Sequence, residues 1–561
     1  MGDFDSIIIG SGAGGLSAAL CLARAGQKVA VIEQHYVPGG WCHSFYINGH
    51  RFSPGVHYIG LLDEGQATSN LYKGLGIAND LVFFRMNPKA YEHCWIGKER
   101  IDMPAEADQL YESLAKRFPK EKKGLKKYLE LVTNVGREIQ LIPKMDGFWD
   151  NITIPYRTRH LGKYALFSLK RVLNWHVKDP LLQKVLNIQC GDHGLPPSKA
   201  SFPFHCAVMD HYIHGGFYPM GGGAAIVKAM TNAIKKYGGE IRTGDGVRNI
   251  LLEQIEGDKK FRAVGVELQQ GERLKADKII SNADPAATYS MVGSENLSRK
   301  LQAKLAKTHY SVTSLMFFLT VDMDVRKSGL DSGNIWMMLN HEMDEVHEDF
   351  FANDIVTTDE FSGLFISCSS LKDPSSYNGR HHTLEIVTFI DYDSFKSKFP
   401  GGNKNSETYK KFKERICDKL LNRLEKVAPG IRDHVVQLDL GTPLTNEYYI
   451  KATKGNVYGT AKSFFQTGPF SYNSKTEIKN LYMCGASIMA HGVTGASYSG
   501  VKTAALILNC KEEDLVKPND SQEIRIYDAE DDTYWPEWLH QKIDDKKRRA
   551  KLETVILSKE V

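Results

Sequence analysis

Several features that mark large classes of protein are missing from this sequence. The longest apolar stretch, residues 313–321, is too short to span a bilayer, so we expect any membrane contact to be peripheral. The formal net charge is only +4, which gives no reason to predict a nucleic-acid partner. Because no internal repeat or low-complexity tract is present, a repeat architecture is not expected either.

The cysteine pattern argues against a disulfide-stabilised fold. Nine cysteines are scattered singly along the chain, and no two form a C-x-x-C pair. An odd number without pairing motifs indicates a reducing compartment. The N-terminus carries Asp3 and Asp5 and enters a strand directly, without the pattern of a signal peptide. We therefore predict a cytoplasmic protein with no metal site, and we leave contact with a membrane surface open.

The composition is that of an ordinary soluble globular protein. With 561 residues, the chain is long enough for two or three domains, or for one large fold with an inserted lobe. Hydrophobic residues make up 42% of the chain, which is enough for a sizeable core.

The first sixty residues contain the most informative motif. A predicted strand at residues 6–9 is followed by the run GSGAGG at residues 10–15, a helix at 16–25 and a second strand at 28–32 that ends at Glu33. Strand, glycine turn, helix, strand and acid in this order are the dinucleotide-binding fingerprint. A purely structural glycine turn is the alternative.

Each residue type in this motif has a physical reason. Gly10 allows the tight turn, Gly12 lets the backbone approach a pyrophosphate, and Gly15 lets the helix pack closely on the strand. The first amides of the helix and its dipole favour the negative charge of the pyrophosphate. Glu33 is positioned to accept hydrogen bonds from a ribose diol. The adjacent Gly39 and Gly40 indicate a second close approach of the backbone to a ligand.

Residues 75–210 interrupt the α/β pattern with helical spacing. Between residues 164 and 177 the apolar positions Leu166, Leu169, Leu173 and Val177 share one helical face, with basic residues interleaved. Such a helix packs on its own core or lies in a membrane interface. We interpret it as a core-packed surface helix and leave the membrane alternative open.

The α/β pattern returns twice further along the chain. A glycine cluster at residues 221–223 precedes a helix and strands between residues 240 and 280, and a strand at 479–485 precedes a helix that begins near residue 492. Together with the N-terminal segment, these regions resemble the discontinuous FAD-binding domain of flavin amine oxidases and phytoene desaturases. No second G-x-G-x-x-G run follows a strand, so a separate NADPH domain is not expected.

Further motifs narrow this resemblance to one branch. They are PGGWCHSF at 38–45, GVHYIG at 55–60, GDHGLPPSKA at 191–200, YPMGG at 218–222, GTPLTN at 441–446, GNVYG at 455–459 and GVTGA at 492–496. In this order they are similar to the retinol saturase branch, which groups with the carotenoid isomerases inside the phytoene desaturase-like family of FAD-dependent oxidoreductases.

The resemblance implies an α/β fold class, with a discontinuous Rossmann-like FAD-binding domain and an α+β substrate domain. We expect the FAD-binding domain in residues 1–74, 211–285 and 471–510, a helical substrate or membrane-facing lobe in 75–210, and the substrate domain in 286–470. Residues 511–561 are expected to form a charged C-terminal tail or a final helix on the surface.

The same resemblance and the fingerprint together give the residues expected to contact FAD. These are Gly10, Gly12, Ala13, Gly14, Gly15, Glu33, Gln34, Gly39, Gly40, Val56, His57, Val247, Gly485, Ala486, Val493 and Thr494.

The implied activity is saturation or isomerisation of carbon–carbon double bonds in a hydrophobic polyene, a retinoid or a carotenoid. Saturation needs a proton donor near the flavin, and the candidates are His57, Tyr58, Asp210, His211 and His214, for which structural roles are the alternative. Two other functions stay open: desaturation of phytoene or another carotenoid, and non-catalytic binding of an isoprenoid lipid, as in the dissociation inhibitors of prenylated GTPases. Which polyene binds, and what exchanges electrons with the flavin, stay open as well.

Overall fold

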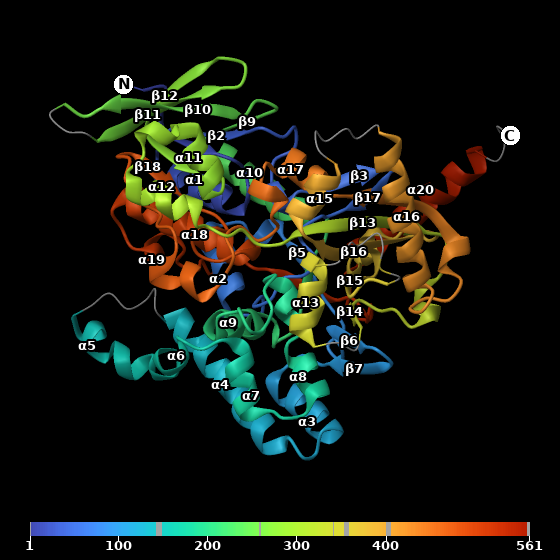
Figure 1. The fold of residues 1–561 in the computed structure, drawn as a ribbon. Coiled ribbons are helices and arrows are strands. Elements are labelled where there is room, and N and C mark those ends of the chain that lie inside the picture. Colours follow the sequence, from blue (N-terminus) through green and yellow to red (C-terminus); the bar gives the residue numbers. More distant parts are fainter. Residues whose placement is uncertain are drawn as a thin grey trace.

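The fold is described from a computed structural model, shown in Figure 1. The structure describes residues 2–141, 148–256, 260–339, 342–352, 358, 360–399 and 406–557.

A seven-stranded sheet forms the cofactor half of the molecule. Its order is β10-β11-β12-β1-β2-β9, with β18 also paired to β12. The pairs β18–β12, β12–β1, β1–β2 and β2–β9 are parallel, so three segments far apart in sequence build one parallel core. The strands are β1 (Phe4–Ile9), β2 (Val29–Glu33), β9 (Glu240–Thr243), β10 (Val247–Gln254), β11 (Phe261–Leu268), β12 (Arg273–Ser281) and β18 (Leu481–Met483).

Three helices cover one face of this sheet, α1 (Ala13–Arg24), α10 (Gly223–Lys236) and α18 (Gly492–Leu508). Helix α1 packs against α18 at glycine contacts. A Cβ atom added to Gly500 would lie 2.0 Å from the carbonyl oxygen of Gly14. The two helices can approach this closely only because Gly500 has no side chain. A Cβ atom added to Gly15 would lie 2.2 Å from the carbonyl oxygen of Gly10, so α1 also lies close to the turn after β1.

A second seven-stranded sheet forms the other half, in the order β17-β13-β16-β15-β14-β6-β7. Its strands are β6 (Glu92–Ile96), β7 (Glu99–Met103), β13 (Thr313–Val321), β14 (Asn334–Met338), β15 (Gly363–Cys368), β16 (His382–Ile390) and β17 (Val435–Gly441). The helices of this region are α13 (Met343–Ala352), α14 (Ser369–Lys372), α15 (Tyr392–Lys398), α16 (Glu407–Leu424) and α17 (Pro443–Ile450).

The predicted domain boundaries need two corrections in this region. Strands β6 and β7 fall within 75–210, which we expected to be a helical lobe, but β6 pairs in parallel with β14 and so extends the second sheet. Helices α11 (Pro285–Val292) and α12 (Arg299–Ala306) fall within the predicted substrate domain. They pack on the first sheet instead, where Tyr289 and Val292 join its core.

The predicted charged tail or final surface helix, 511–561, is attached to the body of the protein in its described residues, and it does end in a helix. Strand β19 (Arg525–Asp528) pairs with β5 (Val82–Arg85), which pairs with β8 (Phe217–Pro219), so the segment completes a small third sheet. Helix α20 (Glu537–Leu557) buries Leu539 and Ile543 beside Phe84. These apolar contacts attach the segment to the body of the protein, although its composition is mostly charged.

The remaining elements named here are α2 (Ala67–Leu75), α19 (Glu512–Leu515) and the hairpin of β3 (Phe45–Ile47) and β4 (His50–Phe52).

Apart from β5, β6 and β7, the described elements of segment 75–210 are helices, and they form the helical lobe drawn in cyan and teal below the sheets in Figure 1. It contains α3 (Ala107–Arg117), α4 (Lys122–Leu141), α5 (Phe148–Arg157), α6 (Arg159–Tyr164), α7 (Leu169–His176), α8 (Pro180–Leu186) and α9 (Phe202–Tyr212).

The amphipathic helix predicted in this lobe is shorter than expected, because α7 begins at Leu169. Leu169, Leu173 and Val177 are buried in the core of the lobe, which favours the core-packed interpretation, but Leu166 is 73% exposed. Within the described residues, no helix has the length and apolarity to cross a membrane.

Candidate functional site

A cavity of about 820 Å³ lies where the two large sheets and the helical lobe meet. This volume is within the range of small-molecule sites, roughly 300–1,000 Å³. One side of the cavity is lined by the turn after β1, the segments that follow β2 and β18, and the start of α18; we call it the glycine side. The other side, which we call the aromatic side, is lined from the second sheet and the lobe.

The turn between β1 and α1 is shaped by its glycines. Gly10 has a φ of +89°, and Gly12 precedes α1 without any side chain capping the helix. A Cβ atom on Gly12 would lie 2.6 Å from the Asn282 amide nitrogen, and one on Gly14 would lie 2.9 Å from the Gly485 Cα. The ends of β1, β12 and β18 therefore meet so closely around the Asn282 side chain that Gly12 and Gly14 could not carry side chains of their own.

A second helix begins at the same cavity. The residue before α18 is His491, and its side chain makes no capping hydrogen bond. Val493 and Thr494 in the first turn line the cavity. The starts of α1 and α18 therefore both turn uncapped amides and the positive end of a helix dipole toward one space, which suits a ligand with anionic and electron-rich groups.

Glu33 is held in place by the glycine turn. Its Oε2 accepts hydrogen bonds from the Ser11 amide at 2.9 Å and from Ser11 Oγ at 2.6 Å, and its Oε1 accepts one from the His35 amide at 2.8 Å. Ser11 Oγ also accepts a hydrogen bond from the Gly39 amide at 2.9 Å. Since each carboxylate oxygen has two acceptor positions, Oε1 keeps one for a ligand hydroxyl. The sequence motif pointed to Glu33 but not to Ser11, which links the turn, the acid and the second glycine loop.

Most residues predicted to contact the cofactor line this cavity. They are Gly10, Gly12, Ala13, Gly14, Glu33, Gln34, Gly39, Gly40, His57, Val247, Gly485, Ala486, Val493 and Thr494. Two do not line it. Gly15 packs against the carbonyl of Gly10, and the Val56 side chain is buried in the core beside Gly223. The structure thus assigns packing roles to Gly15 and Val56, and the individual cofactor contacts of the others stay a prediction.

The predicted catalytic candidates separate into two groups. His57, Tyr58, Asp210 and His211 line the cavity. His214 does not, because it turns away to Glu106, with its Nδ1 2.9 Å from Oε2. The structure also argues against His211 as an acid. Its Nε2 accepts a hydrogen bond from the Gly60 amide, and burial lowers its pKa to about 4, so the ring is neutral and has no proton at that nitrogen.

The sequence reasoning missed a buried ionic cluster beside His57. The Lys372 ammonium is fully buried and donates hydrogen bonds to the His57 carbonyl and to Ser367 Oγ, both at 2.8 Å, and to the Asn334 side chain. Glu385, 1% exposed, accepts a hydrogen bond from the Ser53 amide and lies 3.1 Å from His57 Nδ1. No local spacing in the sequence could have indicated this cluster, because its members come from separate strands and loops.

Aromatic rings cover the opposite side of the cavity. Tyr58 stacks on Tyr212 with ring centroids 4.0 Å apart, and Trp336 lies 4.7 Å from Phe365. Methionines 316, 338 and 343 also line the cavity. This side is suited to a flat, apolar ligand, which it would bind mainly by burial.

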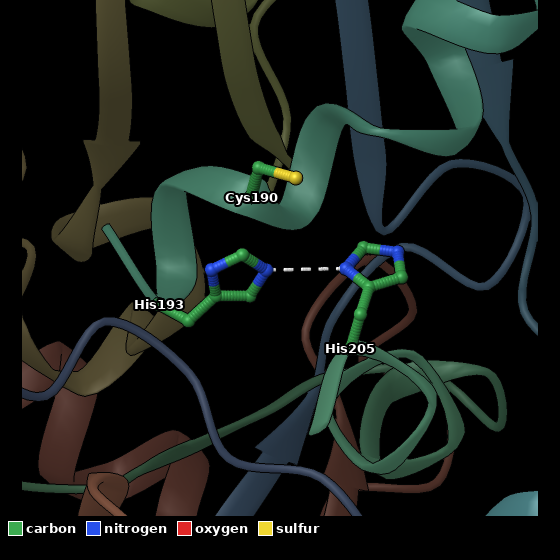
Figure 2. A group of neighbouring side chains, drawn as sticks. All are labelled: Cys190, His193 and His205. Atoms are coloured by element: carbon green, nitrogen blue, oxygen red, sulfur yellow. Dashed lines mark hydrogen bonds between the residues drawn. The ribbon is translucent and has the colours of Figure 1, made fainter. Parts of the chain in front are cut away.

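Cys190, His193 and His205 form a further buried group at the aromatic side, where Cys190 lines the cavity and the two histidines do not. Figure 2 shows the thiol above the two facing imidazoles, and His193 Nε2 lies 3.2 Å from His205 Nδ1. His205 Nε2 faces the Leu186 carbonyl, so it carries the proton and leaves Nδ1 free to accept from His193. Burial keeps both rings neutral and raises the pKa of the thiol. We therefore assign the group a structural role, in which it joins the 3₁₀ turn Ile188–Asp192 to α9.

Comparison with known proteins identifies the ligand of the glycine side. The model of a family described as flavin-containing amine oxidoreductase matches residues 13–508. The chain is 29% identical to the all-trans-retinol 13,14-reductase of Danio rerio over 531 residues, which cover 90% of this chain and 86% of the relative. It is 26% identical to the chloroplastic prolycopene isomerase of Daucus carota over 524 residues, 90% of this chain and 79% of the relative.

A solved structure supports the same fold. The cyclohexylamine oxidase of Brevibacterium oxydans aligns with a TM-score of 0.56 at 14% identity, covering 90% of this chain and 99% of that one. The α/β amine-oxidase architecture and the expected retinol saturase and carotenoid isomerase branch are thereby confirmed.

The residues of the glycine side fit FAD. Two uncapped helix starts are available for the pyrophosphate, and Glu33 keeps an acceptor for a ribose hydroxyl. FAD is the cofactor, and the protein is an FAD-dependent oxidoreductase. This chain belongs to the flavin-containing amine oxidoreductase family.

Proposed function

We propose that the protein saturates or isomerises carbon–carbon double bonds of a hydrophobic polyene, a retinoid or a carotenoid. The observation that carries this proposal is the aromatic side of the cavity, which shares one continuous space with the glycine side. A conjugated chain lying between the rings of Tyr212, Phe365 and Trp336 would be shielded from water next to the flavin. The names of the reductase and isomerase relatives support the same substrate class.

The decisive experiment uses anaerobic, pre-reduced holoenzyme with all-trans-retinol and, separately, with a poly-cis carotenoid. Saturation gives a product with two additional hydrogens, and isomerisation gives one of unchanged mass, so chromatography with mass detection separates the two. The oxidised holoenzyme is the control for desaturation. If neither substrate class is altered while the protein carries FAD, the proposed substrate is wrong. A colourless protein that cannot be reconstituted with flavin would favour the non-catalytic lipid binder.

We also propose that the helical lobe contacts a membrane surface from which such a substrate enters. Tyr156 and Leu166 are each 73% exposed and Trp175 is 47% exposed, and Arg159 and Arg171 lie over neighbouring rings. Exposed aromatic and apolar side chains beside basic ones suit anionic lipid headgroups. Co-sedimentation with vesicles that contain phosphatidylserine tests this, and a Leu166→Ser, Trp175→Ser variant should bind less. Placement in the cytoplasm stays a prediction, which fractionation would test.

A further inference from the structure

We propose that Asp192 is the acid that protonates the substrate carbon during saturation, with Tyr58 positioning its carboxyl group and Glu92 holding a reserve proton behind it. The proposal rests on the proposed function, since it assigns a role in polyene saturation. None of Asp192, Glu92 or Lys372 was indicated by the sequence as a catalytic candidate, although Asp192 lies within the GDHG motif.

The position of Asp192 suits a proton donor. It ends the 3₁₀ turn Ile188–Asp192 and lines the cavity together with Tyr58. The Tyr58 hydroxyl donates a hydrogen bond to Asp192 Oδ2 at 2.8 Å. Tyr58 itself is clamped by two rings, Tyr212 at 4.0 Å and Phe365 at 6.3 Å, so its hydroxyl is fixed in space. The carboxyl is therefore held at the cavity wall on the aromatic side, where the polyene would lie.

Glu92 lies behind this pair and is buried more deeply. It is 0% exposed in β6, next to Asn334 in the paired strand β14. Tyr58 and Asn334 are its nearest donors, but among the described residues neither carboxylate oxygen has a hydrogen-bond partner of standard geometry. A buried, ionised carboxylate without partners is costly, so Glu92 is suited to hold a proton. The nearby Lys372 ammonium supplies one positive charge for the three carboxyl groups of Glu92, Asp192 and Glu385.

The charge balance keeps a proton in the cluster near neutral pH. Burial raises the pKa of Asp192 to about 7 and that of Glu92 to about 8, and it lowers the pKa of Lys372 to about 8. Burial keeps the other titratable groups that interact with Asp192 neutral over this range, namely Tyr58, Tyr91, Tyr212, Tyr458, Cys190 and His491. The proton is therefore shared by the carboxyl groups and the lysine, and they titrate as a unit.

The step balances as follows. Bound FAD in its reduced form supplies a hydride, and with it two electrons, to one carbon of the double bond. The neighbouring carbon takes a proton from the Asp192 carboxyl, so the π bond breaks, two C–H bonds form and the flavin is oxidised. Asp192 is left as a carboxylate that accepts the Tyr58 hydrogen bond, and it regains a proton from Glu92 or from water.

The test compares wild-type holoenzyme with Asp192→Asn, Tyr58→Phe and the control His214→Gln, whose side chain lies outside the cavity. In single turnovers of reduced enzyme with the polyene that the wild type saturates, Asp192→Asn should be slower by about 100-fold or more, with unchanged flavin occupancy. The wild-type rate should fall as the pH rises through about 7. Because the Tyr58 hydrogen bond lowers the pKa of Asp192, Tyr58→Phe should move this fall to higher pH.

A second measurement does not depend on turnover. The folded protein keeps the Asp192 proton up to a pH of about 7, whereas an unfolded chain releases it near pH 4. Between about pH 4 and pH 7 the unfolded chain is ionised at Asp192 and the folded protein is not, so the stability of the folded state falls across this range, and the loss is complete above about pH 7. Asparagine does not titrate and has no such loss. In the oxidised holoenzyme without substrate, the Tm of Asp192→Asn relative to wild type should increase by about 2 °C or more between pH 5 and pH 8.

The outcomes separate the two proposals. If wild-type holoenzyme alters no polyene, the proposed function fails, and this role for Asp192 fails with it. If wild type saturates a polyene but Asp192→Asn does so at the same rate and with the same pH profile, only the inference about Asp192 is overturned. A Tm difference that does not change with pH would also count against it.

Discussion

The two sides of the cavity are built in different ways. The glycine side presents backbone, and its shape depends on what Gly12 and Gly14 lack, because an added Cβ atom at either position would collide with Asn282. The aromatic side presents side chains, and beneath them lie the buried ionisable groups of Lys372 and Glu92. From this difference we expect that adding a side chain on the glycine side prevents cofactor binding. We expect that removing a charge beneath the aromatic side lowers the stability of the protein.

The largest expected effect is on the glycine side. Gly12→Val should abolish FAD binding, because even a Cβ atom there would lie 2.6 Å from the Asn282 side chain, and the larger valine would also block the approach of the pyrophosphate. The flavin absorbance of the purified variant measures this. Gly162→Val is the matched control, since a Cβ atom at that exposed position meets nothing within 4 Å. Normal flavin occupancy in Gly12→Val would contradict our placement of the cofactor.

A change of charge should have the next largest effect, on the aromatic side. Lys372→Met removes the buried ammonium and leaves Glu92 and Glu385 without it, so we expect the free energy of unfolding to fall by about 3–5 kcal/mol. Denaturant unfolding measures this loss. Adding Glu92→Gln should recover part of this loss above about pH 8, where the Glu92 carboxyl of the single variant would need a counter-charge. Lys454→Met, which removes a half-exposed ammonium, is the control.

A smaller effect is expected where the glycine side relies on a side chain. Ser11→Ala removes the hydroxyl that links Glu33 to the Gly39 amide, but the Ser11 amide still holds the acid. Losing these two hydrogen bonds should cost about 1–3 kcal/mol of stability or FAD affinity. Flavin titration of the stripped protein measures the affinity. An unchanged affinity and an unchanged Tm would show that the backbone alone orders this loop.

The smallest effect is expected outside the cavity. His214→Gln removes a partly exposed ion pair with Glu106, so stability should change by less than about 0.5 kcal/mol and turnover should be unaffected. A large loss of turnover with normal stability would return His214 to the catalytic candidates.

How much the sequence could predict also differs between the two sides. The β1–α1 turn and Glu33 are close in sequence, and a ligand that is held by backbone imposes glycine at fixed spacings. The glycine side could therefore be predicted from a local sequence pattern. The hydroxyl of Ser11 was missed because a serine within a glycine run carries no signal of its own.

The aromatic side could not be predicted in the same way, because long-range pairing assembles it. Glu92 meets Asn334 only when β6 pairs with β14, and Lys372 joins them from α14, the short helix after β15. Nothing in the spacing of these residues indicates that they meet. The same holds for β19, whose pairing with β5 attaches a segment that composition alone marked as a tail.

The glycine contact between α1 and α18 has a consequence for how the protein is made. The first helix of the cofactor domain meets its partner only when residues 492–508 have been synthesised, and β18 joins the sheet just before them. Until then the ribosome-bound chain presents a sheet that lacks one strand, and a helix whose glycine face is open to water. We therefore expect flavin loading to be one of the last events of biogenesis, and chains that stop before residue 480 to depend on chaperones rather than on cofactor.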